Sequence, residues 1–132
     1  MRDVATAVIV KDGKILICQR PPHKGNALKW EFVGGKREEG ETLEETLIRE
    51  CKEELDIKVS VGEKITDVVH AYPDMTYRIT LFHAEITEGT PRLLEHVDMK
   101  WINPEDIDTY DFCTADTEIL KKVKYLSGKD KL

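Results

Sequence analysis

The chain has 132 residues, of which 40% are hydrophobic and 35% are charged, and its formal net charge at pH 7 is -6. This length predicts one folded domain over residues 1–132, and the apolar content argues against a disordered protein. The negative charge argues against a broad nucleic-acid-binding surface, although a local acidic cluster could bind cations and through them a phosphorylated ligand.

The first third of the chain predicts a β-hairpin and a loop. Residues 4–10 and 15–18 are apolar runs, and residues 11–14 between them contain an Asp-Gly pair, which is typical of a tight turn. Residues 20–29 contain prolines, a glycine and an asparagine and predict a loop. Residues 30–33 then predict a short strand that ends in a turn at Gly34 and Gly35.

An amphipathic α-helix is predicted from residue 42 to about Leu55. Thr42 and Glu45 form a capping-box pattern, with Thr42 as the N-cap and Glu45 at the third helical position. One side of this helix should be buried, which leaves the other side for charged residues. The apolar residues at helical spacing on the buried side are Leu47, Ile48, Cys51 and Leu55.

The second half of the chain predicts strands at residues 59–69, 77–86 and 93–102 and a closing helix at residues 115–126. The order of strand-rich segment, helix, strand-rich segment and helix favours an α+β (mixed α/β) fold. We expect a mixed β-sheet between helices rather than a regular array of parallel units.

The cysteines and the N-terminus predict a cytoplasmic protein. Cys18, Cys51 and Cys113 are odd in number and lie among apolar residues, which is typical of reduced packing residues rather than of a disulfide or zinc framework. Residues 1–4 lead into an apolar run without a signal-like cleavage region, and no stretch approaches the roughly 20 apolar residues of a membrane span.

Three glutamates of the predicted helix suggest a metal site. Glu50, Glu53 and Glu54 stand at i, i+3 and i+4, so their carboxylates should project from one patch. Carboxylate oxygens favour Mg²⁺, with Mn²⁺ as a substitute, and zinc is not indicated. The alternative is that these acids only solvate a surface helix, and helix composition alone favours that interpretation.

The spacing of the residues from Gly35 to Ile57 favours the metal site over the solvated surface helix. Glu41 follows Gly35 after five residues, and residues 49–54 (Arg-Glu-Cys-Lys-Glu-Glu) follow after seven more. This resembles the Nudix box, Gly-x5-Glu-x7-Arg-Glu-U-x-Glu-Glu-x-Gly-U, where U is a bulky apolar residue. Asp56 departs from it, because the family pattern has glycine there. Asp tolerates a left-handed conformation better than most residues, so we expect a small loss of stability and intact chemistry.

The resemblance implies a Nudix fold, with divalent ions that bridge substrate phosphates, polarise a phosphoryl oxygen and acidify the attacking water. Arg49 would orient the carboxylates, and Glu41 would tie the preceding loop to the helix. The metal ligands that it implies within the box are Glu50, Glu53, Glu54 and the backbone carbonyl of Gly34 or Gly35.

The resemblance extends beyond the box. Residues 18–21 and 30–36 look like the segments that precede the box in MutT-type and CTP pyrophosphohydrolase-type members. Glu95, six residues before Trp101, lies where MutT-like enzymes carry an additional acid near the metals. Either Glu50 or Glu95 could then accept the proton from water. The alternative for Glu95 is a solvent-facing strand residue.

The resemblance also implies substrate contacts. Asp116 lies where MutT-like proteins present Asn or Asp to the base, and its carboxylate would accept a hydrogen bond from the exocyclic amine of cytosine or guanine. The alternative for Asp116 is an ordinary helix N-cap. Further contacts are expected at Arg20, Phe32, Lys36 and Arg78, with Tyr77 as the alternative to Arg78 if the strand register differs by one residue. An exposed arginine and a core aromatic residue are the ordinary interpretations of Arg20 and Phe32. The four histidines show no metal-ligand spacing, which favours surface or packing roles.

The implied function is magnesium-dependent hydrolysis of a (deoxy)nucleoside triphosphate, with cytosine or an oxidised purine (8-oxo-dGTP-like) as the base, to the monophosphate and pyrophosphate. A second possibility is hydrolysis of ADP-ribose or a dinucleoside polyphosphate. A third is a catalytically silent nucleotide sensor, which should lack some of the acids that this chain retains. The expected partner is a small nucleotide rather than nucleic acid or a membrane, and the protein could be a monomer or a homodimer.

Overall fold

The chain begins with the predicted hairpin. In the computed structural model, which describes residues 1–132, β1 (Arg2–Lys11) and β2 (Lys14–Gln19) are joined by a turn in which Asp12 and Gly13 have φ values of 52° and 76°. Two successive positive φ values are typical of a type I′ turn, whose twist suits antiparallel strands. The two strands pair only beside this turn, through Val10 with Ile15 and Lys11 with Lys14. Beyond it they diverge, and each pairs with different strands.

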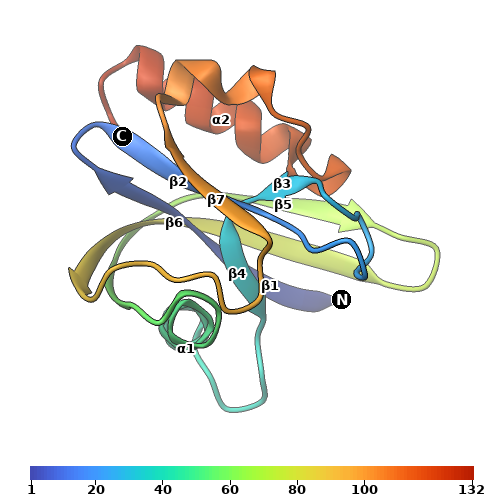
Figure 1. The fold of residues 1–132 in the computed structure, drawn as a ribbon. Coiled ribbons are helices and arrows are strands. Elements are labelled where there is room, and N and C mark those ends of the chain that lie inside the picture. The colour runs from blue at the N-terminus through green and yellow to red at the C-terminus, as the bar shows by residue number, and fades with distance from the viewer.

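The strands form a mixed sheet of seven strands. On one side, β1 pairs in parallel with β6 (Thr76–Glu88) and antiparallel with β4 (Val33–Lys36), and β6 pairs antiparallel with β5 (Lys58–Ala71). On the other side, β2 pairs antiparallel with β3 (Trp30–Glu31) and with β7 (Asp98–Ile102). The divergence of β1 and β2 therefore splays the sheet into two parts (Figure 1).

The short strand predicted at residues 30–33, followed by a glycine turn, is wrong in two respects. The chain leaves β2 and joins β1 at Phe32, so the predicted strand is divided between β3 and β4. Gly34 and Gly35 lie within β4, where they pair with Thr6 and Ala5. A Cβ on Gly34 would lie 2.1 Å from the carbonyl oxygen of Ala5. Glycine is needed at this position because the backbones approach closely, not because the chain turns.

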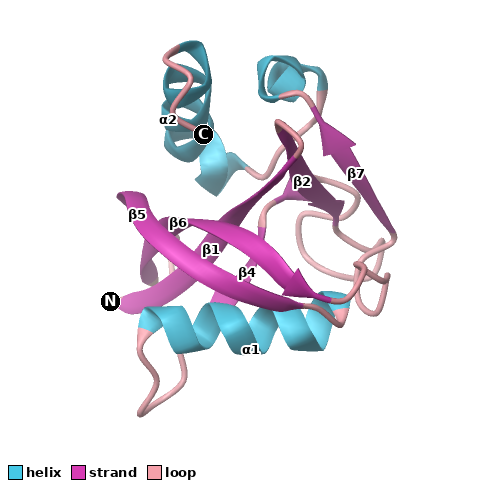
Figure 2. Ribbon diagram, turned by 90° about the vertical axis from the view of Figure 1, so that its left-hand side faces the viewer, coloured by secondary structure: helices cyan, strands magenta, loops and turns pink.

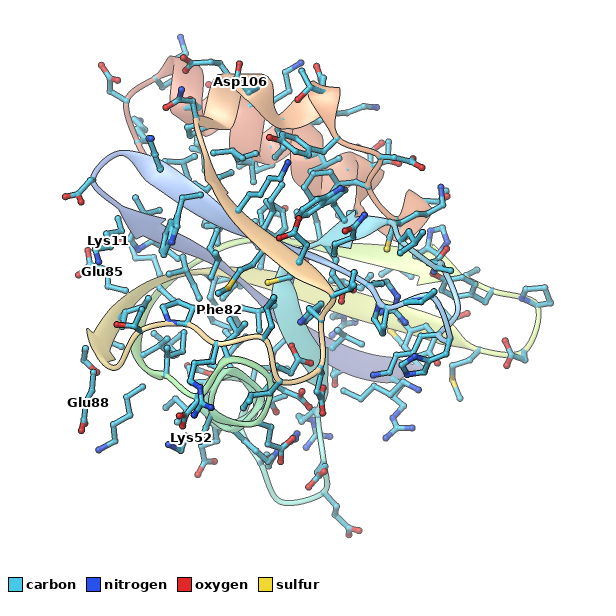
Figure 3. All side chains as sticks on the ribbon, in the orientation of Figure 1. Lys11, Lys52, Phe82, Glu85, Glu88 and Asp106 are labelled. Atoms are coloured by element: carbon cyan, nitrogen blue, oxygen red, sulfur yellow. The ribbon has the colours of Figure 1, made fainter.

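Helices cover both faces of the sheet. Figure 2 shows α1 (Leu43–Leu55) along one face and α2 (Thr117–Gly128) on the other side, where the short helix η1 (Pro104–Thr109) also packs. Alternate residues of β1 serve the two cores: Ile9 packs in the α1 core, and Val8 packs in the α2 core. Phe82 of β6 lies between the sheet and α1 (Figure 3). The expected α+β sandwich is confirmed.

Helix α1 has the predicted start. The Thr42 side chain accepts a hydrogen bond from the Glu45 amide at 3.1 Å, and the Glu45 side chain accepts one from the Thr42 amide at 2.9 Å. The expectation that Ile48 is buried is wrong, because its side chain lies at the edge of the buried face and is 43% exposed. Glu54, a charged residue, is buried on that face although Ile48 is not. The buried residues of the helix are Thr46, Leu47, Cys51, Glu54 and Leu55.

The later elements agree in kind with the prediction and differ in their limits. The strands predicted at residues 59–69 and 77–86 are longer, and the one predicted at residues 93–102 begins only at Asp98. The closing helix begins at Thr117, after the short helix η2 (Thr114–Asp116). All three cysteines are buried and free, as expected. No helix of the chain is both long and apolar enough to cross a membrane.

Candidate active site

A cavity of about 420 Å³ opens where β1 and β2 diverge. Its walls come from β1, the β3–β4 segment, α1, the start of β6, η2 and four loops. The cavity has an acidic end near α1 and a more aromatic end near α2. Its lining includes Thr6, Arg20, Glu31, Phe32, Gly34, Gly35, Lys36, Glu54, Tyr72, Tyr77, Ile79, Glu95, His96, Cys113 and Asp116.

Glu54 is the most deeply buried acid at the acidic end. It is only 8% exposed, and its Oε2 atom has no hydrogen-bond partner. Burial, followed by the charge of Glu50, raises the pKa of the Glu54 carboxyl strongly. A buried carboxylate oxygen without a partner is costly, and a bound cation would remove that cost. The hydrogen-bonding state of Glu54 therefore fits a divalent-cation ligand.

Glu50 and Glu53 lie nearer the surface of α1. The Glu50 carboxylate packs against Gly35, because a Cβ on that glycine would lie 2.5 Å from it. The Glu53 side chain is 53% exposed. No three His, Cys, Asp or Glu side chains are grouped closely enough to hold a metal ion by themselves. The three glutamates therefore occupy graded depths on one side of the helix rather than one converged cluster.

Arg49 links these acids to the loop before the helix. Its guanidinium donates two hydrogen bonds to Glu41, at 2.7 and 3.0 Å, and others to Glu50 at 2.8 Å and Glu53 at 3.3 Å. It also donates to the backbone carbonyl of Lys36 at 3.1 Å. The hydrogen bonds from Arg49 lower the pKa of Glu41 to about 2. Arg49 thus joins the β4–α1 loop to two of the acids, the arrangement that the resemblance implied.

Glu95 lines the acidic end from a loop. The alternative of a solvent-facing strand residue is wrong about the strand, but Glu95 is exposed to solvent as that alternative expected. Its loop, residues 89–97, connects β6 to β7. The negative charge of Glu95 contributes to raising the pKa of Glu54, after burial and Glu50. Glu95 and Glu54 therefore line the same cavity and act on each other electrostatically.

Asp116 lies at the opposite end of the cavity. It occupies the N-cap position of α2, but its side chain makes no capping hydrogen bond, so the capping alternative is wrong. Burial, and to a smaller extent the charge of Glu31, raises the pKa of Asp116 to about 7, against an opposing effect of Arg20. The Asp116 carboxyl is free to bind a ligand in the cavity.

The other predicted substrate contacts divide into two groups. Phe32 is 4% exposed and packs against Phe112 with 5.6 Å between ring centroids, so it is a core residue, and it also lines the cavity. Lys36 lines the cavity and lies over the Tyr77 ring at 5.6 Å. Arg78 is exposed and does not line the cavity, whereas Tyr77 does. Adjacent strand residues point to opposite faces, so a shift of one residue moves this contact from Arg78 to Tyr77.

Sequence reasoning missed Glu31, Tyr72 and His96. Glu31 accepts hydrogen bonds from Arg20 at 3.0 Å and from the His96 ring at 2.9 Å. Tyr72, in the β5–β6 turn, lies edge-on to Tyr77 with 5.7 Å between centroids. Of these three residues, only Glu31 could have been recognised from the local sequence. It is an acid between two aromatic residues, in a strand that must be buried.

Comparison with known proteins shows the family to which this chain belongs. The NUDIX domain family model matches residues 5–122, and the chain therefore belongs to the NUDIX domain family. The CTP pyrophosphohydrolase of Escherichia coli strain K12 is 36% identical over 121 residues, which cover 92% of this chain and 90% of that protein. The 8-oxo-dGTP diphosphatase of Proteus vulgaris is 39% identical over 93 residues, which cover 70% of this chain and 81% of that protein.

A solved structure shows the same architecture over nearly the whole chain. The solution structure of the E. coli ORF135 protein matches with a TM-score of 0.86 and 34% sequence identity. The match covers 98% of this chain and 92% of that protein. The splayed sheet and both flanking helices are thus features of a fold already known in this family.

Proposed function

We propose that the protein hydrolyses a nucleoside triphosphate, with cytosine or an oxidised purine as the base, to the monophosphate and pyrophosphate. One observation carries the proposal: a single cavity joins an acidic end, at Glu54 and Glu95, to an end with Phe32 and Asp116. A nucleotide has the matching polarity, with phosphates at one end and a flat base at the other. The names of the relatives, a CTP pyrophosphohydrolase and an 8-oxo-dGTP diphosphatase, support the same substrate class.

The residues of the acidic end fit magnesium, with manganese as a substitute. The donors are carboxylate and carbonyl oxygens, which these ions prefer, and Glu54 Oε2 is a buried oxygen without a partner. Bound there, the metal would supply charge neutralisation at the phosphates and a lower pKa for the attacking water. The residues proposed to hold it are Glu50, Glu53, Glu54, Glu95 and the backbone carbonyl of Gly34 or Gly35.

The remaining residues would position the substrate and handle the proton. Glu50 or Glu95 accepts the proton from the attacking water, and Arg49 keeps Glu50 and Glu53 in place through its hydrogen bonds. Lys36 faces the phosphates. The base would lie on Phe32, with its polar edge toward Asp116 and Arg20. Arg78 would contact only a part of the substrate that extends beyond the cavity.

We further propose that residues 1–132 form one domain that works in the cytoplasm on small nucleotides, as a monomer or homodimer. Three buried, unpaired cysteines support a reducing compartment. The net charge of -6 favours neither nucleic acid nor an anionic membrane as a partner.

The glutamate assignment is tested by Glu53→Gln. Glu53 is exposed, so the substitution should leave the fold intact, whereas loss of a charged ligand should reduce kcat at least 100-fold. Glu44→Gln is the matched control, because Glu44 is an exposed acid in the first turn of the same helix. Pyrophosphate release and thermal unfolding would be measured for both variants. Near-normal turnover of Glu53→Gln would exclude Glu53 from the metal site.

The substrate class is tested by a panel of CTP, dCTP, methylated dCTP, 8-oxo-dGTP and ADP-ribose, each with magnesium. We expect pyrophosphate release to be fastest with a cytosine or oxidised-purine triphosphate. A preference for ADP-ribose would replace the proposal with its enzymatic alternative. Tight binding of a nucleotide without turnover of any substrate would instead indicate a sensor.

A further inference from the structure

We propose that His96 is a positioning residue that holds Glu95 at the acidic end of the cavity through a partly buried hydrogen bond to Glu31. The inference rests on the proposed function, because it gives Glu95 a role beside the metal. The His96 side chain is only 4% exposed, and its Nε2 atom lies 2.9 Å from Glu31 Oε2. A carboxylate accepts, so Nε2 carries the proton and donates.

The loop of residues 89–97 carries Glu95 to the cavity. Backbone hydrogen bonds hold this loop to other elements both before and after Glu95. Before Glu95, the Leu94 amide donates to the Glu54 carbonyl at 3.3 Å, and the Arg92 amide donates to the Leu55 carbonyl at 2.9 Å. After Glu95, the Val97 amide donates to the Gln19 carbonyl at 3.0 Å. These backbone hydrogen bonds fix the path of the loop. They do not fix how far Glu95 and His96 extend toward the interior of the protein.

His96 fixes that depth because it is the only buried residue between Pro91 and Val97. Glu95 is exposed, and both residues line the cavity. With no regular structure around Glu95, its carboxylate depends on the neighbouring buried imidazole for its position. Outer partners of this kind typically change metal affinity or activity by about 10- to 100-fold when they are removed.

A packing role alone does not account for His96. Burying an imidazole in place of an apolar side chain is unfavourable unless its nitrogens are hydrogen-bonded, and His96 Nδ1 has no partner. Glu31 also accepts a hydrogen bond from Arg20 at 3.0 Å. Arg20 is in turn held by the Gly25 carbonyl at 2.7 Å. Glu31 therefore connects the loop that carries Glu95 with the residue proposed to face the base.

The experiment compares His96→Leu with His96→Gln. Leucine removes the donor, whereas the glutamine amide can place an N–H near the former Nε2. We expect His96→Leu to lower kcat about 10- to 100-fold and to raise the magnesium concentration for half-maximal activity, with the nucleotide KM changed less than threefold. His96→Gln should restore most of both. Equal loss in the two variants would overturn the proposal, since the hydrogen bond would then be irrelevant.

A double-mutant cycle distinguishes a role of His96 in positioning Glu95 from a general effect of the substitution on the structure. In the Glu95→Gln background, His96→Leu should lower kcat by less than about threefold, because there is no catalytic carboxylate left to position. The same loss in both backgrounds would mean that His96 acts independently of Glu95. His83→Leu is the matched control, because His83 is half-buried in β6 and makes no side-chain hydrogen bond. It should leave kcat within about twofold of the unmodified protein.

Two readouts do not need turnover and therefore separate this proposal from the proposed function. Hydrogen exchange of residues 89–97 in the metal-free protein should become faster in His96→Leu and not in His96→Gln. Mn²⁺ titration should show about tenfold weaker binding in the leucine variant. Unchanged exchange and unchanged Mn²⁺ affinity would overturn the proposal. If no nucleotide is hydrolysed but both readouts shift, the proposed reaction is wrong and the positioning role of His96 stands.

Discussion

At the scale of single residues, Asp116 is an acid whose surroundings favour its neutral form. Its ordinary pKa of 3.8 rises to about 7 because the half-buried carboxyl is partly removed from solvent and Glu31 lies nearby. A neutral carboxyl donates as well as accepts a hydrogen bond, whereas a carboxylate only accepts. Near neutral pH, Asp116 can therefore present either pattern to a base. The sequence-based expectation of a hydrogen-bond acceptor applies to its ionised form.

The raised pKa predicts how Asp116→Asn changes stability with pH. Below about pH 4 the acid is protonated in both the folded and unfolded protein, and it contributes no pH dependence. As pH rises toward 7, the unfolded state loses the proton first, so the stability of the unmodified protein falls. The asparagine variant escapes this loss. Its free energy of unfolding, relative to the unmodified protein, should increase by about 1 to 3 kcal/mol between pH 4 and pH 8.

Urea unfolding of both proteins at pH 4, 6 and 8 measures this difference, and titrations common to the two proteins cancel. A pH-independent difference would mean that Asp116 titrates normally in the fold. The substrate panel would also be run on Asp116→Asn. If the ranking of bases is unchanged, Asp116 does not determine which base is preferred.

The spacing of Glu50, Glu53 and Glu54 predicted a shared side of the helix but not the depth of each side chain. Depth depends on β4, whose glycines let the backbone approach α1 so closely that Glu50 packs on Gly35. Glu54 falls on the line of Leu47, Cys51 and Leu55 and is buried with them. Such packing between distant segments has no signature in a local spacing.

At the scale of elements, the C-terminus of α1 shows how Asp56 replaces the family glycine. Asp56 adopts a left-handed conformation with φ 55° and ψ 43°, as the departure from the pattern predicted. Its carboxylate pairs with Lys52 and Arg92, and the hydrogen bond from Lys52 is the main reason that the pKa of Asp56 is lowered. The side chain thereby offsets part of the backbone strain that glycine would avoid.

Substitutions at position 56 should separate these two effects. Asp56→Gly relieves the strain and loses the ion pairs, so its Tm should stay within about 2 °C of the unmodified protein. Asp56→Ala keeps the strain and loses the ion pairs, so its Tm should lie about 3 to 5 °C below that of Asp56→Gly. Thermal unfolding in low and high salt tests both. Equal Tm values for the two variants would show that the left-handed backbone carries no cost here.

Elements were predictable where their determinants are local. The α1 capping box, the Asp-Gly hairpin turn and the left-handed Asp56 each depend on neighbouring residues, and each was found as predicted. Residues 93–97, the second half of the loop at residues 89–97, were mistaken for strand because Leu93 and Leu94 are apolar, yet both are exposed, at 46% and 49%. Its path depends on hydrogen bonds to α1 and β2, which lie far away in sequence.

At the scale of the whole molecule, the cavity exists because β1 and β2 part soon after their turn. The segment from β3 to β4 crosses between them at Phe32 and ties the two parts of the sheet together. The sequence predicted the strands but not their divergence, since that depends on which partner each strand finds. The crossing is possible only if β4 can lie close against β1, and Gly34 allows this approach.

Gly34→Ala should therefore weaken the whole fold rather than one loop. The added Cβ would lie 2.1 Å from the Ala5 carbonyl oxygen and 2.7 Å from the Thr6 Cα, and backbone atoms cannot swing aside as a side chain can. We expect a loss of about 3 kcal/mol or more, equivalent to a fall in Tm of about 10 °C. The control is Gly25→Ala, where an added Cβ meets nothing within 4 Å and the backbone φ is not positive.

The control should change stability by less than about 1 kcal/mol, and its sign should be favourable because alanine restricts the unfolded chain. Thermal and urea unfolding of both variants would give the two differences. If Gly34→Ala does not fold, the contrast with a folded Gly25→Ala supports the same conclusion. A Gly34→Ala variant as stable as the control would mean that β4 can move away from β1 without cost. In that case the crossing at Phe32 would not determine how the two parts of the sheet, and with them the two ends of the cavity, are placed relative to each other.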